Sequence, residues 1–526
     1  MPGASKKIQL GVSFIASAAL MAAMTSCTIS PSSQGDGNRD GTIILAVAGE
    51  VTSIDPVNAD YSQADMIEST LYDTLVSYDS SGKIVPKLAT EFTQSADAKS
   101  ITIKLRDGVK FHDGTPLEAS DVVYSLTRYQ ELGRGVANLI SSFESAEATD
   151  TSSVKINLKR PDSTMLGALS KIYIVNADLV EKNAGSDRGQ TWLQSNDAGS
   201  GAYVTKAGPG AGDVTVEAFA GYWNVRNDRP QQLIFRRIDE SGTQRDELRA
   251  GNIDIALYLN SRDAEELKNT AGITTGSLPQ ALQTYVFFNT TTGPTADVRV
   301  RRAIELAYDY SGGLQGIRGG FGTIANGPLP ETLPCRIEDQ PNAQNKEEAK
   351  KLLADAGAEN LKLTMRFQPA FPAMSREATL LQSNLKEIGV DLELQPIAFP
   401  DYLKSLGSPD TIPQMALIED FAQYPDPGVM LIKGYRSTAT GTNKAGFSDP
   451  KVDQLLDAAE ASADATERCG LYKDAQKIIN DQVPAINMYT VGQPAGWRSD
   501  IKGIDPSPTV LLLAPAETLR VGDGQK

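Results

Sequence analysis

The feature that most constrains the fold of this chain is a unit of helix, glycine and strand that occurs twice in succession. In the first copy, a helical pattern spans 345–356, ends at Gly357 and leads to an alternating strand at 361–367. The second copy repeats this order around Gly389. The apolar residues that define both helical faces and the second strand are Ala349, Leu352, Leu353, Ala356, Leu381, Leu385, Ile388, Val390, Leu392 and Leu394. Repeated helix-to-strand units predict an α/β fold, in which helices pack on a sheet.

The length of the chain, 526 residues, exceeds what one ordinary hydrophobic core organises, so we expect two or more domains. Short apolar or alternating segments predict strands in the earlier part of the chain, at 42–47, 101–105, 214–219 and 233–238. The α/β pattern therefore extends beyond the two repeated units.

The charge excludes one large class of partner. The net charge is −16 and the pI is about 4.8, and no basic cluster interrupts this acidity. An acidic surface repels phosphate backbones and anionic membrane faces. We therefore expect no nucleic-acid partner.

The first residues have the layout of a bacterial export signal. Two lysines precede an uncharged, mostly small or apolar stretch at 8–24, which is short for a membrane span. A small residue directly before Cys27 resembles the lipobox of bacterial lipoproteins. This resemblance implies a signal peptide at 1–26, an acylated Cys27 and a lipid anchor on the outer face of the cell membrane. The Ser- and Gly-rich residues up to 41 would form, with that anchor, a flexible tether at 27–41. An ordinary secretory signal with an incidental Cys is the alternative.

Two further cysteines, Cys335 and Cys469, would lie outside the reducing cytoplasm. Such a compartment permits one disulfide between them. Two separate buried thiols are the alternative, because the sequence does not give the distance between their Cα atoms.

The residue inventory favours binding over catalysis. His112 is the only histidine and lies in a Gly/Asp turn, so we expect neither a His-based triad nor a metal site of His and Cys. The paired glycines lack the Lys-Ser/Thr ending of a phosphate-binding loop. Adjacent carboxylates at 239–240, 347–348 and 419–420 are interpreted mainly as solvated faces of an acidic protein, although a hydrolase built on carboxylates alone is an alternative. We predict a binding protein without enzymatic activity, cofactor or metal.

Several segments together resemble one protein family. The stretch KLRDGVKFHDGTPLEASD at 104–121 resembles the signature of the family 5 extracytoplasmic solute-binding proteins, the peptide, dipeptide and nickel receptors of ABC importers. In this family the signature block is structural, which implies that His112 does not bind the ligand. Further blocks follow the family's order to the end of the chain, namely SIDP (53–56), LYDTLV (71–76), IVPKLA (84–89), GSGAY (199–203), YW (222–223), AGNIDI (250–255), DVRVRRAI (297–304) and LYKDAQKIINDQVP (471–484).

The resemblance implies an α/β, two-lobed periplasmic-binding-protein fold with an extra peripheral domain and a ligand cleft between the lobes. The first lobe would hold 42–80, 200–284 and 493–526, with the peripheral domain at 81–199, and the second lobe would hold 285–492. The implied function is that of a monomeric extracytoplasmic receptor, which captures a solute by hinge closure. It would deliver the solute to ABC permease subunits served by cytoplasmic ATPases.

The segment IEDFAQYPDPG at 418–428 resembles the cleft loop of the second lobe, whose common form is W-x-x-D-Y-x-D-P. In peptide-binding members the first Asp of that loop pairs with the α-amino group of the peptide, and the Trp packs on the ligand. Here Gln423 stands in place of that Asp and Asp420 in place of the Trp, whereas Tyr424 fits the pattern. Gln423 cannot neutralise an ammonium group, and burying an ammonium group without a counter-charge is costly.

Two hypotheses follow from this departure. In the first, Glu419 or Asp420, which flank Phe421, supplies the missing charge and the ligand is still a short peptide. In the second, the ligand is another solute, such as a nickel chelate, an opine or a sugar. The two carboxylates could also merely face water at the rim of the cleft.

The remaining ligand-binding candidates come only from alignment with the family and are Asn58, Asp60, Tyr61, Arg134, Gln283 and Tyr285. The first three follow the turn where the family's first lobe meets the ligand. The arginine lies in a region where some nickel receptors place a cleft arginine. The last two lie on the strand QTYVFFN, which would cross between the lobes.

Short peptides are the expected ligands, ahead of a nickel chelate, because the one histidine lies in the structural signature. A lipoprotein that keeps the fold but acts as a signalling receptor or chaperone is an alternative function. A permease and an ATPase encoded beside this chain would favour import.

Overall fold

The computed structural model describes residues 41–59, 61–210, 212–338, 342–369, 371–405, 409–439, 441–504 and 518–522. The predicted signal segment, its Cys27 and the ligand candidate Asp60 lie outside the described residues. The described residues belong to one compact unit.

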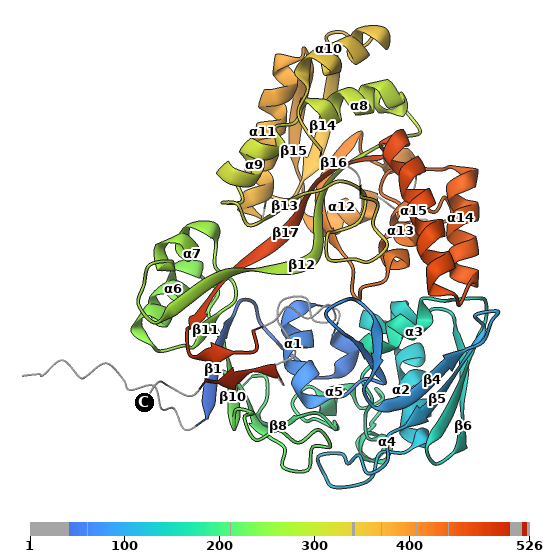
Figure 1. The fold of residues 1–526 in the computed structure, drawn as a ribbon, viewed down its shortest axis with the longest axis vertical. Coiled ribbons are helices and arrows are strands. Elements are labelled where there is room, and N and C mark those ends of the chain that lie inside the picture. The colour runs from blue at the N-terminus through green and yellow to red at the C-terminus, as the bar shows by residue number, and fades with distance from the viewer. Residues whose placement is uncertain are drawn as a thin grey trace, which may run out of the picture. The chain divides into compact units, whose positions relative to one another are not determined.

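The N-terminal part of this unit mixes strands and helices (Figure 1), and the predicted strands are confirmed as β1, β5, β9 and β10 with small shifts at their ends. The strands are β1 (Thr42–Val47), β2 (Val76–Tyr78), β3 (Ile84–Pro86), β4 (Ala89–Gln94), β5 (Ser100–Leu105), β6 (Phe143–Asp150), β7 (Ser153–Leu158), β8 (Tyr203–Ala207), β9 (Val214–Ala218), β10 (Gln232–Arg237) and β11 (Ile255–Ala256). The helices are α1 (Ser62–Leu71), α2 (Ala119–Leu132), α3 (Met165–Ala168), α4 (Ala177–Lys182), α5 (Gln190–Leu193), α6 (Ser241–Ala250) and α7 (Ser261–Leu267).

The C-terminal part contains both predicted helix–glycine–strand units. The first is α10 and β14, where the Asn345 side chain caps the helix by accepting a hydrogen bond from Glu348 N at 3.1 Å. The second is α11 and β15, and Gly389 between them has φ +83°, a conformation that favours glycine. The helices of this part are α8 (Val298–Ala307), α9 (Tyr310–Gly316), α10 (Lys346–Asp355), α11 (Pro372–Glu387), α12 (Phe399–Ser405), α13 (Pro427–Tyr435), α14 (Pro450–Ala461) and α15 (Ala465–Gln482). The strands are β12 (Ile273–Phe288), β13 (Gly322–Ile324), β14 (Lys362–Phe367), β15 (Asp391–Pro396), β16 (Met415–Phe421), β17 (Ala485–Arg498), β18 (Ile501–Lys502) and β19 (Arg520–Val521).

One mixed sheet runs through both parts in the order β15-β14-β16-β12-β17-β11-β1-β10-β9-β8. Its two long strands, β12 and β17, lie side by side and antiparallel along most of their length (Figure 1). One end of the pair joins β11 and the other end joins β16, so these strands cross from the N-terminal to the C-terminal part. Their register shifts between Pro279 and Gln283, which interrupts the ladder in the middle of the crossing.

The buried apolar side chains divide in the same way. The N-terminal core gathers side chains mainly from residues 43–278, with a few later ones such as Tyr424 and Ala495. Two C-terminal cores draw their members from residues 285–489 and pack on the two faces of the sheet strands β12 and β16, and one of them also includes residues of β14. The lobe boundaries drawn from the sequence stay predictions.

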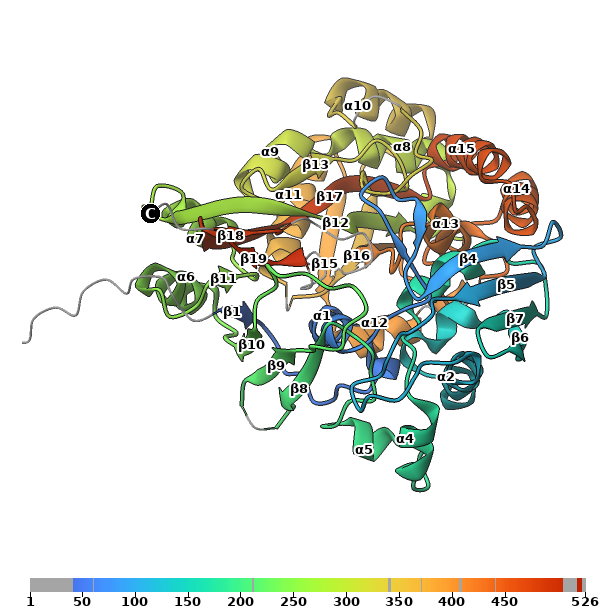
Figure 2. The same cartoon turned by 60° about the horizontal axis from the view of Figure 1, so that its bottom comes forward.

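A separate antiparallel sheet, in the order β4-β5-β7-β6, lies in the N-terminal part (Figure 2). Helix α2 packs beside it and begins with a capping box, in which Glu118 and Asp121 exchange hydrogen bonds between side chain and backbone. This helix and the strands before it contain the family signature, whose residues therefore build a scaffold.

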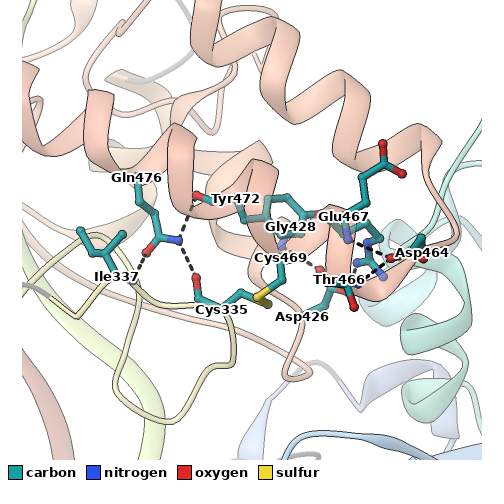
Figure 3. Close-up of a disulfide and its surroundings, with 11 residues drawn as sticks. Cys335, Ile337, Asp426, Gly428, Asp464, Thr466, Glu467, Cys469, Tyr472 and Gln476 are labelled. Atoms are coloured by element: carbon teal, nitrogen blue, oxygen red, sulfur yellow. Dashed lines mark hydrogen bonds and ion pairs between the residues drawn. A yellow bond between two sulfur atoms is a disulfide. The ribbon is translucent and has the colours of Figure 1, made fainter.

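Cys335 and Cys469 are joined by a disulfide, with their Cα atoms 5.0 Å apart (Figure 3). The bond links the segment 325–338 to the start of α15. Further along α15, Gln476 Nε2 donates a hydrogen bond to Cys335 O at 2.8 Å, and Gln476 Oε1 accepts one from Ile337 N at 3.4 Å. The segment is thus attached to the helix by covalent and polar contacts together.

The segment 325–338 also contacts both crossing strands. On β12, Gln283 Nε2 donates a hydrogen bond to Gly327 O at 2.9 Å. On β17, Thr490 Oγ1 accepts a hydrogen bond from Glu331 N at 2.9 Å. The disulfide therefore fixes a segment that braces the crossing strands.

Replacing both cysteines, as C335S/C469S, should lower the free energy of unfolding by about 2–5 kcal/mol. The reason is that the bond closes a loop with a sequence separation of 134 residues, which restricts the unfolded chain. Urea unfolding followed by circular dichroism measures the change. Wild-type protein unfolded with a thiol reductant should match the double variant, and a variant as stable as the oxidised wild type contradicts the prediction.

Candidate ligand-binding site

The end of β16 and the loop after it form the centre of the candidate site. The cleft segment predicted at 418–428 begins within β16, which lies between β12 and β14 in the sheet. After the loop, α13 begins at Pro427, and Asp426 caps it by accepting a hydrogen bond from Gly428 N at 2.8 Å. Strand and capped helix thus fix both ends of the loop.

Two cavities share Phe421 in their walls. The first, here called the apolar cavity, has a volume of about 670 Å³. Its walls include Leu282, Phe371, Met374 and Phe421, with Gln368 and Glu419 as polar groups. Phe371 is half exposed, so this cavity has an apolar side chain at its surface.

The second, here called the polar cavity, has a volume of about 400 Å³. It is bounded from both parts of the chain. The N-terminal part contributes Arg160, Asp162 and Thr164, and the C-terminal part contributes Gln423, Lys433 and Glu460. A molecule in this cavity would touch both parts at once.

Glu419 does not simply face water at a cleft rim. Its Oε1 accepts a hydrogen bond from Arg318 Nη2 at 2.6 Å, and its side chain is 19% exposed. Arg318 also forms two hydrogen bonds to Glu377, with its Nε 2.7 Å from Oε1 and its Nη2 3.1 Å from Oε2. One guanidinium group is therefore shared between two carboxylates.

The pKa values of Arg318 and Glu377 are set by burial and by the neighbouring charges. Burial alone lowers the pKa of Arg318, but the two carboxylates outweigh it and raise the pKa above its usual value, so the guanidinium stays charged. For the fully buried Glu377, burial raises the pKa more than Arg318 lowers it. Glu377 therefore takes up a proton more readily than an exposed glutamate.

Asp420 is buried and already paired with two cations, and its role as a partner of a ligand's ammonium group stays a prediction. Its Oδ1 accepts a hydrogen bond from Lys433 Nζ at 2.7 Å, and its Oδ2 accepts one from Lys444. Burial alone raises the pKa of Asp420, but the two lysines outweigh it and hold the pKa well below its usual value. Asp420 is a structural anion between two cations.

Gln423 lines the polar cavity, and its role as a ligand contact stays a prediction. Tyr424 borders the same cavity, but it is only 2% exposed and its ring belongs to the N-terminal core. Burial raises the pKa of its hydroxyl well above the usual value. Its ring joins the loop to the N-terminal core, and its role as a ligand contact stays a prediction.

Gln283 and Tyr285 are buried on β12 and line neither of the two cavities, so their role as ligand contacts stays a prediction. The Tyr285 hydroxyl donates a hydrogen bond to Pro328 O at 2.8 Å, and its ring lies 5.2 Å from that of Phe287. Gln283 donates to Gly327, as described above, and its Oε1 accepts no hydrogen bond from the described residues. Their hydrogen bonds hold the bracing segment 325–338.

The structure brings two of the first-lobe candidates together away from the two cavities. Arg134 Nη2 donates a hydrogen bond to Asn58 Oδ1 at 3.3 Å. Tyr61 is partly exposed and occupies the N-cap position of α1, where its side chain makes no capping hydrogen bond to the helix backbone. None of the three lines the apolar or the polar cavity, so their role as ligand contacts stays a prediction.

Several side chains of the site were missed by the sequence analysis, above all Gln368, Arg318 and Lys433. Arg318 stands among Gly316, Gly319 and Gly320, an unusual setting for a charge that could have marked it. The other two carry no signal in the sequence, because their place in a cavity depends on contacts between distant segments.

His112 lies in a different place and has a structural role. Its Nδ1 is hydrogen-bonded to Asp197, its Nε2 contacts Gly201 O at 3.1 Å, and its ring packs edge-on against Phe219. Burial alone lowers the pKa of His112, but the hydrogen bond and charge of Asp197 outweigh it, so the pKa lies above 6.5. Within the described ranges, no group of three or more His, Cys, Asp and Glu side chains is placed to hold a metal ion.

Comparison with known proteins identifies relatives over most of the chain. The family model described as bacterial extracellular solute-binding proteins, family 5, matches residues 83–442. The chain is 26% identical over 472 residues to the probable D,D-dipeptide-binding periplasmic protein DdpA of Escherichia coli K12, covering 88% of this chain and 90% of DdpA. It is 28% identical over 488 residues to heme-binding protein A of Haemophilus influenzae, covering 85% of this chain and 88% of that protein.

The solved structure of HbpA2 from Haemophilus parasuis shares the fold, with a TM-score of 0.82 and 23% identity. The match covers 91% of this chain and 99% of HbpA2. The predicted α/β periplasmic-binding-protein fold is confirmed by this and related structures. Among the helices that the structure describes, none has the length and apolar character needed to cross a membrane.

Replacing the buried anion, as Asp420→Asn, should lower the free energy of unfolding at pH 7 by about 3–5 kcal/mol, because two lysines would lose their counter-charge. The folded-state pKa of Asp420 lies below the usual 3.8, so its contribution is present above that pH and lost as the pH falls below it. The stability gap between variant and wild type should therefore narrow below about pH 4. Urea unfolding at several pH values measures the gap. Asp401→Asn, at an exposed ion pair with Lys404, is the control and should change stability by less than about 1 kcal/mol.

Since His112 is the only histidine, its titration can be followed by NMR without assignment. Its midpoint should lie above 6.5, because Asp197 stabilises the imidazolium form. In Asp197→Asn, burial remains without the anion, so the midpoint should fall below 6.5. A wild-type midpoint at or below 6.5 would refute the pairing.

Proposed function

The chain belongs to the family 5 bacterial extracellular solute-binding proteins, and we propose that the solute it captures is a short peptide. Members of this family are transport receptors, not enzymes. The chain is accordingly a solute-binding protein of an ABC importer. Its relatives act outside the cytoplasm.

The observation that carries the peptide proposal is the pairing of an apolar with a polar cavity around Phe421. A peptide combines a polar backbone with side chains that are often apolar. Its backbone could contact the polar walls and an apolar side chain could contact the apolar walls. Their volumes, about 670 and 400 Å³, lie in the range of small-ligand sites. DdpA, named as a D,D-dipeptide-binding protein, also supports a peptide ligand.

A heme ligand, suggested by the name of the Haemophilus influenzae relative, fits less well. Heme iron is commonly bound by a His, Cys, Met or Tyr side chain. The one histidine, His112, is hydrogen-bonded to Asp197, and Cys335 and Cys469 form the disulfide. Tyr424 at the polar cavity and Met374 at the apolar cavity are each only 2% exposed.

Capture would proceed by closure around the crossing strands. Because Arg160 and Asp162 come from one part of the chain and Gln423 and Lys433 from the other, a ligand in the polar cavity favours the arrangement in which the parts meet. The register shift after Pro279 gives β12 and β17 a place to bend. Release to the permease requires the reverse motion.

The location of the receptor is part of the proposal. Cys27 would carry the lipid that anchors the protein to the outer face of the cell membrane, with residues up to 41 as a tether. A monomeric receptor on such a tether remains close to the permease subunits. The support is the lipobox-like sequence at Cys27 and the extracytoplasmic setting of the relatives.

Native mass spectrometry of the gently purified protein should show added masses that correspond to a set of short peptides. Unfolding the protein releases them for sequencing by tandem mass spectrometry. Protein refolded from urea, which has lost its cargo, is the control and should regain the masses when incubated with a digest of short peptides. One non-peptide mass, or a metal adduct, would overturn the peptide proposal.

A further inference from the structure

The disulfide between Cys335 and Cys469 lies beside a third cavity, here called the disulfide cavity, with a volume of about 390 Å³. Both parts of the chain contribute to its walls, among them Tyr78, Lys83 and Phe92 from the N-terminal part and Cys335, Asp426 and Arg468 from the C-terminal part. Both cysteines are partly exposed. A small molecule in this cavity would therefore reach the bond without unfolding of the protein.

The charge of the disulfide cavity suits thiol chemistry. Among the described residues of its walls, Lys83 and Arg468 are cations and Asp426 is the one carboxylate. Cationic surroundings favour the thiolate over the thiol. The thiolate is the form that attacks a disulfide and also the form that leaves it. The cavity therefore favours both halves of thiol–disulfide exchange.

The backbone at Cys335 has an unfavourable conformation. Its φ is +59°, in the left-handed region, which costs free energy for a residue with a Cβ atom. The disulfide holds its side chain, and Gln476 donates a hydrogen bond to its carbonyl oxygen. Cleaving the bond removes one of these two restraints. The backbone can then relax, and the segment 325–338 moves with it.

The other cysteine is linked to the loop between the cavities. Arg468, which precedes Cys469 on α15, forms an ion pair with Asp426 (Figure 3). The two side chains are only 14% and 9% exposed. Asp426 also accepts the capping hydrogen bond from Gly428 N at the start of α13. A shift of Cys469 therefore acts through one mostly buried ion pair on the loop that contains Gln423.

A second chain of contacts runs from Cys335 to the crossing strands. Gln283 and Tyr285 of β12 donate hydrogen bonds to backbone oxygens of the segment 325–338. Thr490 of β17 accepts one from the same segment. The disulfide is thus connected both to the loop of the candidate site and to the strands around which closure is proposed.

We propose that the Cys335–Cys469 bond is an exchangeable disulfide, and that its reduction by a low-molecular-weight thiol loosens the loop and lowers the affinity for the captured solute. The oxidised protein holds the solute, and the reduced protein releases it more readily. This redox control goes beyond the proposed function. It does not require the solute to be a peptide, because it acts on the protein's own contacts.

The exchange takes place in two balanced steps. The small thiolate attacks one cysteine sulfur, the bond between the two cysteines breaks, and the second cysteine leaves as a thiolate that takes up a proton. Another small thiolate then attacks its own kind in the mixed disulfide and releases the first cysteine, which also takes up a proton. Two small thiols are oxidised to one disulfide, and the protein gains two thiols.

The test treats the native protein with 2-mercaptoethanol and counts the new thiols by iodoacetamide labelling. Far-ultraviolet circular dichroism should stay unchanged, because the chain remains folded. Hydrogen exchange in peptides covering 419–432 and 283–287 should become about fivefold faster or more. Exchange in the separate sheet β4-β5-β7-β6 should not change. In native mass spectrometry, the fraction of protein that keeps its co-purified masses should fall about fivefold or more.

Two variants test the connection. C335S/C469S should behave as the reduced wild type in both measurements. Arg468→Gln keeps the disulfide but breaks the ion pair with Asp426, so the oxidised variant should already exchange faster at 419–432, and reduction should add little there. Lys477→Gln, at an exposed ion pair with Asp474 on the same helix, is the matched control for loss of one cation and should behave as the wild type.

The outcomes separate this inference from the proposed function. Thiols that appear only in urea, or a reduced protein with unchanged exchange at 419–432, would overturn the redox control, also where no added mass co-purifies. Equal acceleration by reduction in Arg468→Gln and wild type would overturn the connection through Arg468. Peptide masses that stay bound after reduction would overturn the redox control while the peptide function stands. A non-peptide mass that reduction releases would support the redox control and overturn the peptide function.

Discussion

The antiparallel pairing of β12 with β17 is the constraint on which the rest of the described structure depends. The ladder runs from Ile273 opposite Arg498 to Phe287 opposite Ala485. The two strands supply hydrogen-bond partners to each other's peptide groups, so they carry the chain between the N-terminal and C-terminal cores as a defined ladder. The interruption after Pro279 leaves this ladder a place to bend. The proposed closure on a ligand would then need only a local change of the backbone.

The chemistry of the site follows from how β16 is packed next to this pair. Its last residues alternate between the two sides of the sheet, so Glu419 and Asp420 point in opposite directions. On one side Asp420 is surrounded by Lys433 and Lys444, which stabilises the fold. On the other side Glu419 shares Arg318 with Glu377 and keeps one oxygen at the apolar cavity. Two adjacent carboxylates thus have different roles, because neighbouring residues of a strand meet different surroundings.

Much of the fold could be predicted from local patterns. The helix after Asn345 and the turn at Gly389 depend on capping and on a glycine conformation that act within a few residues. The site could be predicted only in part. The position of the 418–428 loop followed from its similarity to a family motif, and Gln423 does line a cavity. The sequence does not distinguish a ligand contact from a core residue at Tyr285 and Tyr424, whose rings are both buried, because an aromatic residue fits a core as well as a cleft.

The sequence by itself determined the α/β class, the repeated units, the absence of a catalytic set and the family, because these depend on periodicity, composition and ordered local motifs. Tertiary structure alone decided which charges are already paired and which keep an unused oxygen. Arg318, Glu377 and Glu419 are far apart along the chain and come from three different segments. Cys335 and Cys469 are likewise far apart along the chain, with a sequence separation of 134 residues. The physical reason is that a charge or a thiol acquires its role from what lies within a few ångströms of it, and the order of residues does not encode that distance directly.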